Sequence, residues 1–223
     1  MLKVRNLGKK YEDISGTIWP VRGVDLDVPK GRFLCITGRS GSGKTTLLKM
    51  LGGILHPTEG TIEVEGVSIY DLPEKKLAAY RSDKTGFIFQ DYFLEDKYTV
   101  YQNIEVAMMI NRIPERNRKD RIEDALQQVG MLHKEFAFVQ NLSGGEKQRI
   151  SIARAIVTQP DILFADEPCG NLDAENGREI MQLLREQVQK GRSVILITHN
   201  REDAQLTDEI ITLQDGKIIN SEN

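Results

Sequence analysis

The fold is decided by the stretch FLCITGRSGSGKTTLLKML, residues 33–51. It starts with an apolar run of strand length, Phe33–Ile36, and ends with leucines at helical spacing. Between them lies GRSGSGKTT, Gly38–Thr46, which matches GxxxxGK(S/T) in the strand-to-helix context that this motif requires. We therefore predict a loop whose backbone N–H groups surround phosphate oxygens at a helix N-terminus. The competing interpretation is a glycine-rich turn that only caps a helix.

Two side chains of this loop have chemistry of their own. Lys44 is expected to reach the terminal phosphates of a nucleotide, and the Thr45 hydroxyl is expected to ligate Mg²⁺. The other members contribute small side chains and backbone donors. The predicted nucleotide-binding residues of the loop are Gly38, Arg39, Ser40, Gly41, Ser42, Gly43, Lys44, Thr45 and Thr46.

A second motif, ILFADE at Ile162–Glu167, is an apolar strand that ends in two adjacent carboxylates. In phosphate-loop enzymes the first of these, here Asp166, helps to hold Mg²⁺ through its hydration shell. Glu167 is then left to polarise the attacking water, a role typically worth a factor of about 10² to 10⁴ in rate. The alternative is a pair of solvated acids at the end of a strand.

A third motif, LSGGEKQR, begins a helix with an apolar face. Ser143 and Glu146 have the spacing of a capping box, which by itself predicts only a well-capped helix. A cap does not need Gly144 and Gly145, however, and two glycines leave an electropositive helix N-terminus that an anion can approach. We therefore predict a second phosphate site here.

The rest of the chain suggests one α/β unit, a single domain of residues 1–223. Short β-type runs dominate the start of the chain, and helical spacing dominates from about 96–158. Continuous apolar runs after that indicate buried parallel strands with crossover helices. We place the core and a β subdomain at about 1–95 and 159–223, with a helical subdomain at about 96–158. Residues 214–216, Gln-Asp-Gly, predict a tight hairpin turn.

Composition narrows the classes of partner. The formal net charge of -3 gives no basic surface, so we predict no nucleic-acid partner. The apolar runs are too short to cross a bilayer, and we expect a cytosolic chain that spans nothing. Cys35 and Cys169 lack the spacing of metal ligands, so reduced thiols without an assigned role are expected.

Taken together, the three motifs resemble those of ABC (ATP-binding cassette) ATPases: GRSGSGKTT and ILFADE are similar to Walker A and B, and LSGGE to the signature sequence. The resemblance covers essentially the whole chain. It implies a P-loop NTPase core with a parallel central sheet, an N-terminal antiparallel β subdomain and an inserted α-helical subdomain. It also implies ATP hydrolysis with Mg²⁺ by a head-to-tail dimer, in which Ser143 and Gly145 of one copy close over the ATP bound by Lys44 of the other. The implied signature residues are Ser143, Gly144, Gly145 and Glu146.

The same resemblance assigns further residues to catalysis. Gln90 resembles the Q-loop residue that contacts Mg²⁺ and the attacking water, and His199 resembles the switch histidine that contacts the γ-phosphate. With Glu167 they form the implied catalytic set. Asp173, in EPCGNLD, resembles the D-loop aspartate that links the two composite sites. Related subunits usually read EPTGNLD, so Cys169 replaces a threonine and a local hydrogen bond is in question.

Tyr11 resembles the A-loop aromatic residue that stacks on adenine, a use that suits a flat and rigid side chain. Two observations leave this assignment open. An ordinary surface tyrosine would look the same in the sequence, and Trp19 lies nearby as a second candidate.

The segment FIFQDYFLEDKYTVYQNIEVAM, residues 87–108, is most similar to a bacterial branch that includes lipoprotein-release, macrolide-export, cell-division and antimicrobial-peptide-resistance ATPases. Membership implies an integral membrane permease-type partner and a peripheral position at the cytoplasmic face of the bacterial cell membrane. Aromatic residues and methionines in this segment suit a socket for that partner, although simple packing explains them equally well. The alternative function is a regulatory ATPase that controls a membrane-bound cell-wall hydrolase or sensor. Soluble ABC proteins of DNA repair or translation are disfavoured, because the sequence shows neither long coiled coils nor tandem cassettes.

Overall fold

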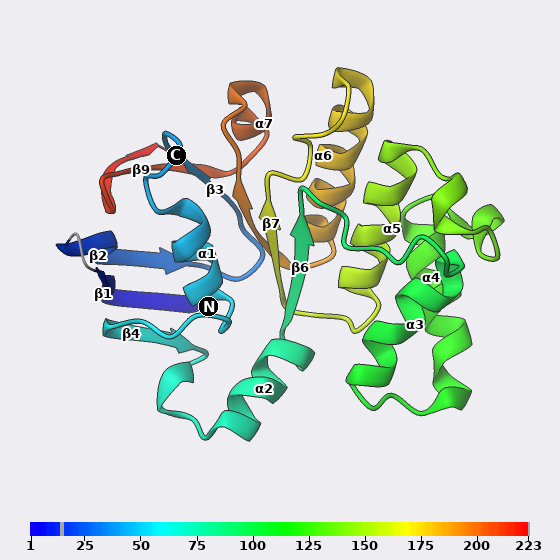
Figure 1. Ribbon diagram of the computed structural model, residues 1–223, viewed down its shortest axis with the longest axis horizontal. Coiled ribbons are helices and arrows are strands. Elements are labelled where there is room, and N and C mark those ends of the chain that lie inside the picture. Colours follow the sequence, from blue (N-terminus) through cyan, green and yellow to red (C-terminus); the bar gives the residue numbers. More distant parts are fainter. Residues whose placement is uncertain (14–15, 223) are drawn as a thin grey trace.

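The larger of two β-sheets forms the centre of the molecule (Figure 1), in a computed structural model that describes residues 1–13 and 16–222. Its strand order is β10-β9-β3-β8-β7-β6, and every neighbouring pair is parallel except the β9–β10 hairpin. The strands are β3 (Phe33–Thr37), β6 (Thr85–Phe89), β7 (Ile162–Asp166), β8 (Ser193–Ile197), β9 (Glu209–Gln214) and β10 (Lys217–Glu222). The predicted parallel sheet is thereby confirmed. The predicted hairpin is confirmed as well, with Asp215 and Gly216 at φ values of 47° and 77° in its turn.

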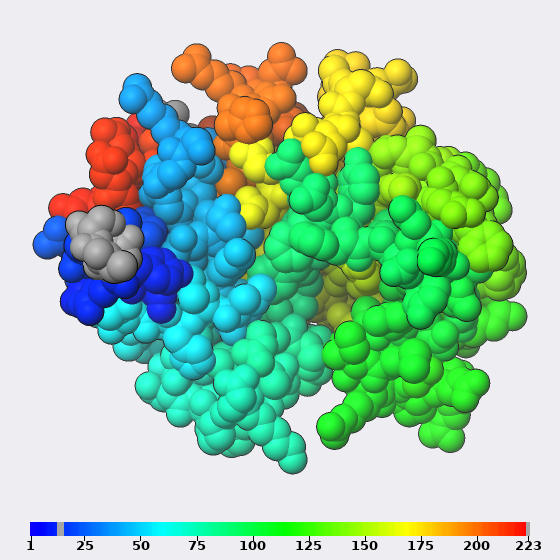
Figure 2. Space-filling model, viewed as in Figure 1, coloured from blue at the N-terminus to red at the C-terminus, as the bar shows by residue number. Residues whose placement is uncertain are grey.

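A smaller antiparallel sheet lies beside it, with strand order β2-β1-β4-β5. Its strands are β1 (Leu2–Asp13), β2 (Gly16–Val28), β4 (Glu59–Val64) and β5 (Val67–Ser68). Figure 2 shows the blue N-terminal strands next to the red C-terminal hairpin, and β2 contacts β10 there. The two ends of the chain therefore build one edge of the molecule.

Helices pack against both faces of the larger sheet (Figure 1). They are α1 (Lys44–Leu51), α2 (Glu74–Asp83), α3 (Val100–Ile110), α4 (Arg118–Gln128), α5 (Gly144–Ile156), α6 (Ala174–Gln189) and α7 (Arg201–Gln205), with 3₁₀ turns at Ile69–Asp71, Glu115–Asn117, Leu132–Lys134 and Val139–Asn141. The helices α3, α4 and α5 pack on one another, and α5 also contacts β6 at the edge of the larger sheet. This group falls within the predicted helical subdomain, whose boundaries at about 96 and 158 stay a prediction. Within residues 1–13 and 16–222, no helix has the length and apolar character needed to cross a membrane.

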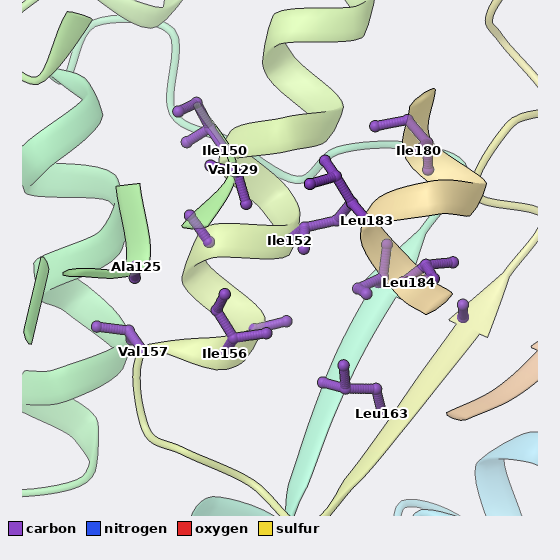
Figure 3. Packing of buried hydrophobic residues seen from close by; sticks show 14 of the residues in the cluster. Ala125, Val129, Ile150, Ile152, Ile156, Val157, Leu163, Ile180, Leu183 and Leu184 are labelled. Atoms are coloured by element: carbon purple, nitrogen blue, oxygen red, sulfur yellow. The ribbon is translucent and has the colours of Figure 1, made fainter. Parts of the chain in front are cut away.

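The two faces of the larger sheet pack into different cores. On β7, Leu163 and Ala165 belong to the core under α3, α4, α5 and α6, whereas Ile162 and Phe164 belong to the core shared with α1 and the smaller sheet. Figure 3 shows side chains of α5 and α6 meeting over Leu163. Because both faces are buried, the strand is apolar at every position until Asp166. The first carboxylate of the chain's ILFADE motif thus appears where the strand leaves the core.

Candidate active site

A cleft opens at the carboxyl ends of β3, β7 and β8, which is where ligands bind in open α/β sheets. The glycine-rich loop after β3 forms one wall, and residues that follow β7 and β8 form the other. The lining residues are Pro20, Gly38, Arg39, Ser40, Gly41, Gly43, Lys44, Thr45, Thr46, Asp166, Glu167, Ile197 and His199. The structure therefore brings together most of the residues that the sequence predicted.

The N-terminus of α1 is open toward this cleft. Gly43 is the N-cap residue at φ 101°, and no side chain caps the helix. A Cβ atom at this position would lie 1.8 Å from the carbonyl oxygen of Pro20, so only glycine fits. The Lys44 ammonium folds over the loop and donates to the carbonyl oxygens of Gly38 and Arg39, at 2.9 and 3.0 Å. This arrangement leaves backbone donors and one cation in a position to bind phosphate.

Thr45 and Asp166 meet across the floor of the cleft. The Thr45 hydroxyl donates to Asp166 Oδ2 at 3.1 Å. Burial raises the pKa of the Asp166 carboxyl, and the hydrogen bond from Thr45 opposes that rise. A hydroxyl and a carboxylate side by side are the oxygen donors that Mg²⁺ takes alongside water and substrate phosphate, so these two residues fit the metal that the sequence predicted.

Glu167 is held in an unusual backbone conformation beside His199. Its φ is 50°, a left-handed value that costs about 1–3 kcal/mol in a residue other than glycine. Its N–H donates to the carbonyl oxygen of Ile197 at 2.9 Å, and its own carbonyl accepts from Gly170 N at 3.0 Å. The His199 Nδ1 atom lies 2.9 Å from both carboxylate oxygens of Glu167. A carboxylate only accepts, so Nδ1 carries the proton in this pair and orients Glu167.

Three of the residues predicted to meet the nucleotide, Mg²⁺ or water within one chain do not line the cleft. The Gln90 side chain donates from Nε2 to Asn171 Oδ1 at 3.0 Å, and Asn171 Nδ2 donates back to the Gln90 carbonyl at 3.2 Å. Tyr11 lies on β1 opposite Ile18 and is exposed. Ser42 is a buried member of the loop itself, and its hydroxyl has no hydrogen-bond partner among the residues that the structure describes.

The signature segment lies away from the cleft of its own chain, at the start of α5. The predicted capping box is confirmed: Glu146 N donates to Ser143 Oγ at 3.3 Å, and Ser143 N donates to Glu146 Oε2 at 2.9 Å. Lys134 forms an ion pair with Glu146 and, together with the Ser143 N–H, lowers the pKa of that carboxyl. Gly144 is exposed, whereas a Cβ on Gly145 would lie 2.3 Å from Asn176 Oδ1. This helix N-terminus is therefore already occupied by its own side chains.

The EPCGNLD segment connects β7 to α6. Asp173 is the N-cap of α6, and it accepts from Asn176 N at 2.9 Å and from Asn176 Nδ2 at 2.8 Å. These hydrogen bonds lower the pKa of Asp173. Cys169 donates from Sγ to the Gly177 carbonyl at 3.5 Å, so the thiol makes a local hydrogen bond in place of a hydroxyl. Burial raises the pKa of the Cys169 thiol to about 12, which keeps it protonated.

Sequence reasoning missed Gln148, which the structure places between the end of β6 and the segment that follows β7. This α5 residue is fully buried, and its Nε2 donates to the carbonyl oxygens of Phe89 at 3.2 Å and Pro168 at 2.7 Å. Its spacing from Ile152, one turn along the same helix, put a polar side chain on the apolar face. A polar residue on an apolar helix face indicates a buried amide, but it does not identify the carbonyl groups that the amide binds.

Comparison with known proteins supports this picture. A family model described as ABC transporter matches residues 21–170. The lipoprotein-releasing system ATP-binding protein LolD of Syntrophus aciditrophicus is 41% identical over 220 residues, covering 98% of this chain and 99% of that protein. The macrolide export ATP-binding/permease protein MacB of Chlorobium luteolum is 36% identical over 222 residues, which are 100% of this chain and 33% of that protein.

Solved structures of the bacterial ABC transporter cassette MJ0796 have the same fold. A dimeric structure of that protein has a TM-score of 0.91 with this chain at 33% identity, and covers 100% of this chain and 98% of its own. A dimeric post-hydrolysis state of the same cassette, bound to ADP and Pi, has a TM-score of 0.90 at 33% identity, with the same coverage.

Proposed function

This chain belongs to the ABC transporter family and hydrolyses ATP, and from that premise we propose that it is the ATPase subunit of a membrane complex, closing head to tail with a second copy to drive a separate permease-type subunit. Its similarity to the lipoprotein-release and macrolide-export proteins confirms the predicted branch of the family. The observation that carries the proposal is the separation of two predicted phosphate sites within one chain. One lies in the cleft, and the other lies at the start of α5.

Within the cleft, each residue has a defined task in this proposal. The open N-terminus of α1 and Lys44 bind the terminal phosphates of ATP. Thr45 would ligate Mg²⁺ directly and Asp166 would hold it through water, and the ion would neutralise charge on the phosphate oxygens. His199 orients Glu167, and Glu167 accepts a proton from water as its oxygen bonds to the γ-phosphorus and the bond to the β–γ bridging oxygen breaks.

Two predicted residues need a rearrangement to take their assigned roles. Gln90 has to release Asn171 before its amide can turn toward Mg²⁺ and the attacking water. Tyr11 has to meet adenine from outside the present lining of the cleft, where β2 now contributes Pro20. Closure of the dimer around ATP is the step in which we place both movements, since substrate-induced closure commonly completes a catalytic site.

The second copy supplies what the cleft lacks. In the proposed dimer Ser143, Gly144, Gly145 and Glu146 of one copy cover the ATP held by Lys44 of the other, and Asp173 connects the two sites. The signature residues do not line their own cleft, and MJ0796 forms a dimer in both of its structures. These two facts support the head-to-tail arrangement.

A socket for the membrane subunit is supported by the exposed aromatic residues beside α3. Phe93, Tyr98 and Met109 are exposed by 66%, 47% and 54%, whereas Met108 is fully buried and belongs to the core. The Phe93 backbone is left-handed, at φ 48°, and the Arg154 guanidinium holds its carbonyl at 2.5 Å. An apolar side chain that a strained and anchored backbone presents to solvent is suited to a protein partner.

The relatives favour a permease as that partner. This chain matches one third of the MacB protein named above, which combines ATP-binding and permease functions in one polypeptide. We therefore place this chain at the cytoplasmic face of the cell membrane, bound to a permease-type subunit. The alternative is a regulatory ATPase on a membrane-bound cell-wall hydrolase or sensor, and it uses the same site residues.

Copurification tests the proposal directly. A tagged Glu167→Gln chain is isolated from detergent-solubilised native membranes in the presence of ATP, and the wild-type chain in ADP is the matched control. We expect the variant to bind ATP, to lose steady-state hydrolysis and to accumulate as a dimer with a stoichiometric multi-spanning membrane protein. Mass spectrometry identifies that protein, and its extracytoplasmic domains distinguish export from control of a hydrolase or sensor.

Two results would contradict parts of the proposal separately. Undiminished turnover in Glu167→Gln would remove Glu167 from its role as the base. Recovery of soluble proteins alone would leave the ATPase intact but would exclude the membrane complex.

A further inference from the structure

We propose that Gln148 is a positioning residue for ATP hydrolysis, which holds the two loops that carry Gln90 and Glu167 at a fixed separation. The inference rests on the proposed roles of those two residues in the cleft. Gln148 itself touches neither of them. It acts through the backbone carbonyl groups next to each one, Phe89 and Pro168.

The two loops part at the point where Gln148 binds. Strands β6 and β7 are parallel neighbours, and their last register pair is Phe89 with Asp166. The residue that follows β6 is Gln90, and the residue that follows β7 is Glu167. Pro168 has no backbone N–H, so the ladder cannot extend through it. The Gln148 amide thus spans the gap just beyond the end of the paired strands from the buried side, in addition to the two hydrogen bonds between Gln90 and Asn171.

Glu167 needs such a support because its backbone is strained. Its left-handed φ of 50° is stable only where the surroundings fix it from both sides. On its N-terminal side, the Glu167 N–H donates to Ile197 of β8. On its C-terminal side there are two supports: the Glu167 carbonyl accepts from Gly170 N at 3.0 Å, and Gln148 holds the next carbonyl, that of Pro168, at 2.7 Å. Loss of the Gln148 amide would remove one of the supports on the C-terminal side of Glu167, the residue proposed to activate water.

The buried environment argues that the amide is kept for its two donors. Gln148 is fully buried, and its Oε1 has no hydrogen-bond partner among residues 1–13 and 16–222. An unpaired buried acceptor lowers stability. The side chain nevertheless directs both N–H groups at the two loops. Its place on α5, five residues after Ser143, also connects these loops to the surface proposed to meet the second copy.

The experiment compares Gln148→Met with Gln187→Met in the full-length chain. Gln187, on α6, is the matched control: it is also fully buried, and its amide accepts from Arg192 at 2.6 Å, away from the cleft. Steady-state hydrolysis is measured over a range of ATP concentrations, at protein concentrations where turnover per chain no longer rises. For Gln148→Met we expect kcat to fall by about 10- to 100-fold, with KM and ATP affinity within about twofold of wild type, because small misplacements of reacting groups have effects of this size.

Gln187→Met is expected to lose thermal stability with kcat within about twofold of wild type, since it disturbs only packing and one hydrogen bond. If Gln148→Met does not fold, Gln148→Glu takes its place. This variant keeps the shape of the side chain and replaces its two donors by a carboxylate oxygen. The same loss of kcat is expected. Wild-type kcat in either folded Gln148 variant would overturn the inference, as would an equal loss of kcat in Gln187→Met. The wild-type chain and Glu167→Gln are assayed alongside, so failure of the base assignment is read independently of Gln148.

Discussion

The N-termini of α1 and α5 both follow a Gly-containing motif, yet the structure equips them differently. At α1 the N-cap is Gly43, no side chain caps the helix and no acid lies in its first turn. At α5 the N-cap is Ser143, which forms both bonds of a capping box, and Glu146 neutralises the helix dipole. The first helix therefore has no side-chain cap on its donors, whereas the capping box of the second satisfies the N–H groups of Ser143 and Glu146.

This difference explains how one protein uses the two ends at different moments. In the proposed mechanism, the uncapped N-terminus of α1 with Lys44 beside it binds phosphate within a single chain. In the same proposal, the capped N-terminus of α5 contributes only when a second copy brings its nucleotide there. In this proposal, the N-cap residue, Gly43 or Ser143, determines whether a helix N-terminus binds phosphate within one chain or only in the dimer.

The largest effect on ATP binding is expected from replacing the glycine at the start of α1, and the matching replacement at the start of α5 is the comparison. Gly43→Ala places a Cβ atom 1.8 Å from the Pro20 carbonyl oxygen. Gly144→Ala meets side-chain ends alone, the Tyr92 hydroxyl at 3.0 Å and Leu172 Cδ2 at 3.7 Å. We expect Gly43→Ala to weaken ATP binding by about 100-fold or more, because several charge-assisted hydrogen bonds to phosphate depend on the loop. Gly144→Ala should bind ATP within about twofold of wild type, since small steric adjustments at a surface site have little effect. Calorimetric titration of each chain with ATP measures both, and equal affinities of the two variants would contradict the comparison.

A smaller effect is expected at α5, and only in the dimer. Ser143→Arg puts bulk and charge at the proposed approach of the second copy's nucleotide while leaving the cleft of its own chain unchanged. We expect ATP affinity of the single chain to stay within about twofold of wild type and ATP-dependent dimerisation to weaken by about tenfold or more, a loss typical of blocking one central contact. Introducing the change on a Glu167→Gln background keeps ATP intact during size-exclusion chromatography with light scattering. Dimerisation equal to that of the parent would show that α5 does not cover the partner's ATP.

The smallest effect is expected on stability, from removing the charge of Glu146 in the first turn of α5. Lys134 and the Ser143 N–H lower the pKa of Glu146 in the folded chain, so this carboxylate stabilises the fold above its unfolded pKa of about 4.3 and loses that effect as pH falls through the lower folded value. Glu146→Gln keeps a capping acceptor and removes the charge. We expect its Tm to lie about 2–4 °C below wild type from pH 5 to 8, given a partly exposed pair worth about 1 kcal/mol. The difference should shrink below about pH 4, and a difference that grows in acid would exclude this role for the charge.

Much of the cleft could be predicted because its residues are set by local patterns. Gly43 and Lys44 follow from the loop motif, and Asp166, Glu167 and His199 lie at the ends of apolar strands that a parallel sheet brings to one edge. Each of these positions depends on the strand or helix that holds it, and periodicity identifies those elements.

The remaining features depend on contacts between segments far apart in the chain. Gln90 points to Asn171, 81 residues later, and nothing in the sequence near Gln90 indicates that partner. Gln148 binds the carbonyl of Phe89, 59 residues earlier, through a buried amide that a helical pattern marks only as an anomaly. The exposure of Tyr11 likewise depends on how β1 and β2 pair, with register shifts along their length. Such details are fixed by packing rather than by a motif.

The strand order has a consequence for synthesis of the chain. Strand β3 ends directly before the glycine-rich loop, but both of its sheet neighbours, β8 and β9, are encoded close to the C-terminus. On the ribosome this apolar strand therefore emerges more than 150 residues before the strands that it pairs with, Ser193–Ile197 and Glu209–Gln214. Long-range parallel pairing of this kind folds slowly and leaves strand edges open to aggregation. The sheet neighbours that flank the strand before the glycine-rich loop are therefore in place only after β8 and β9 have been added.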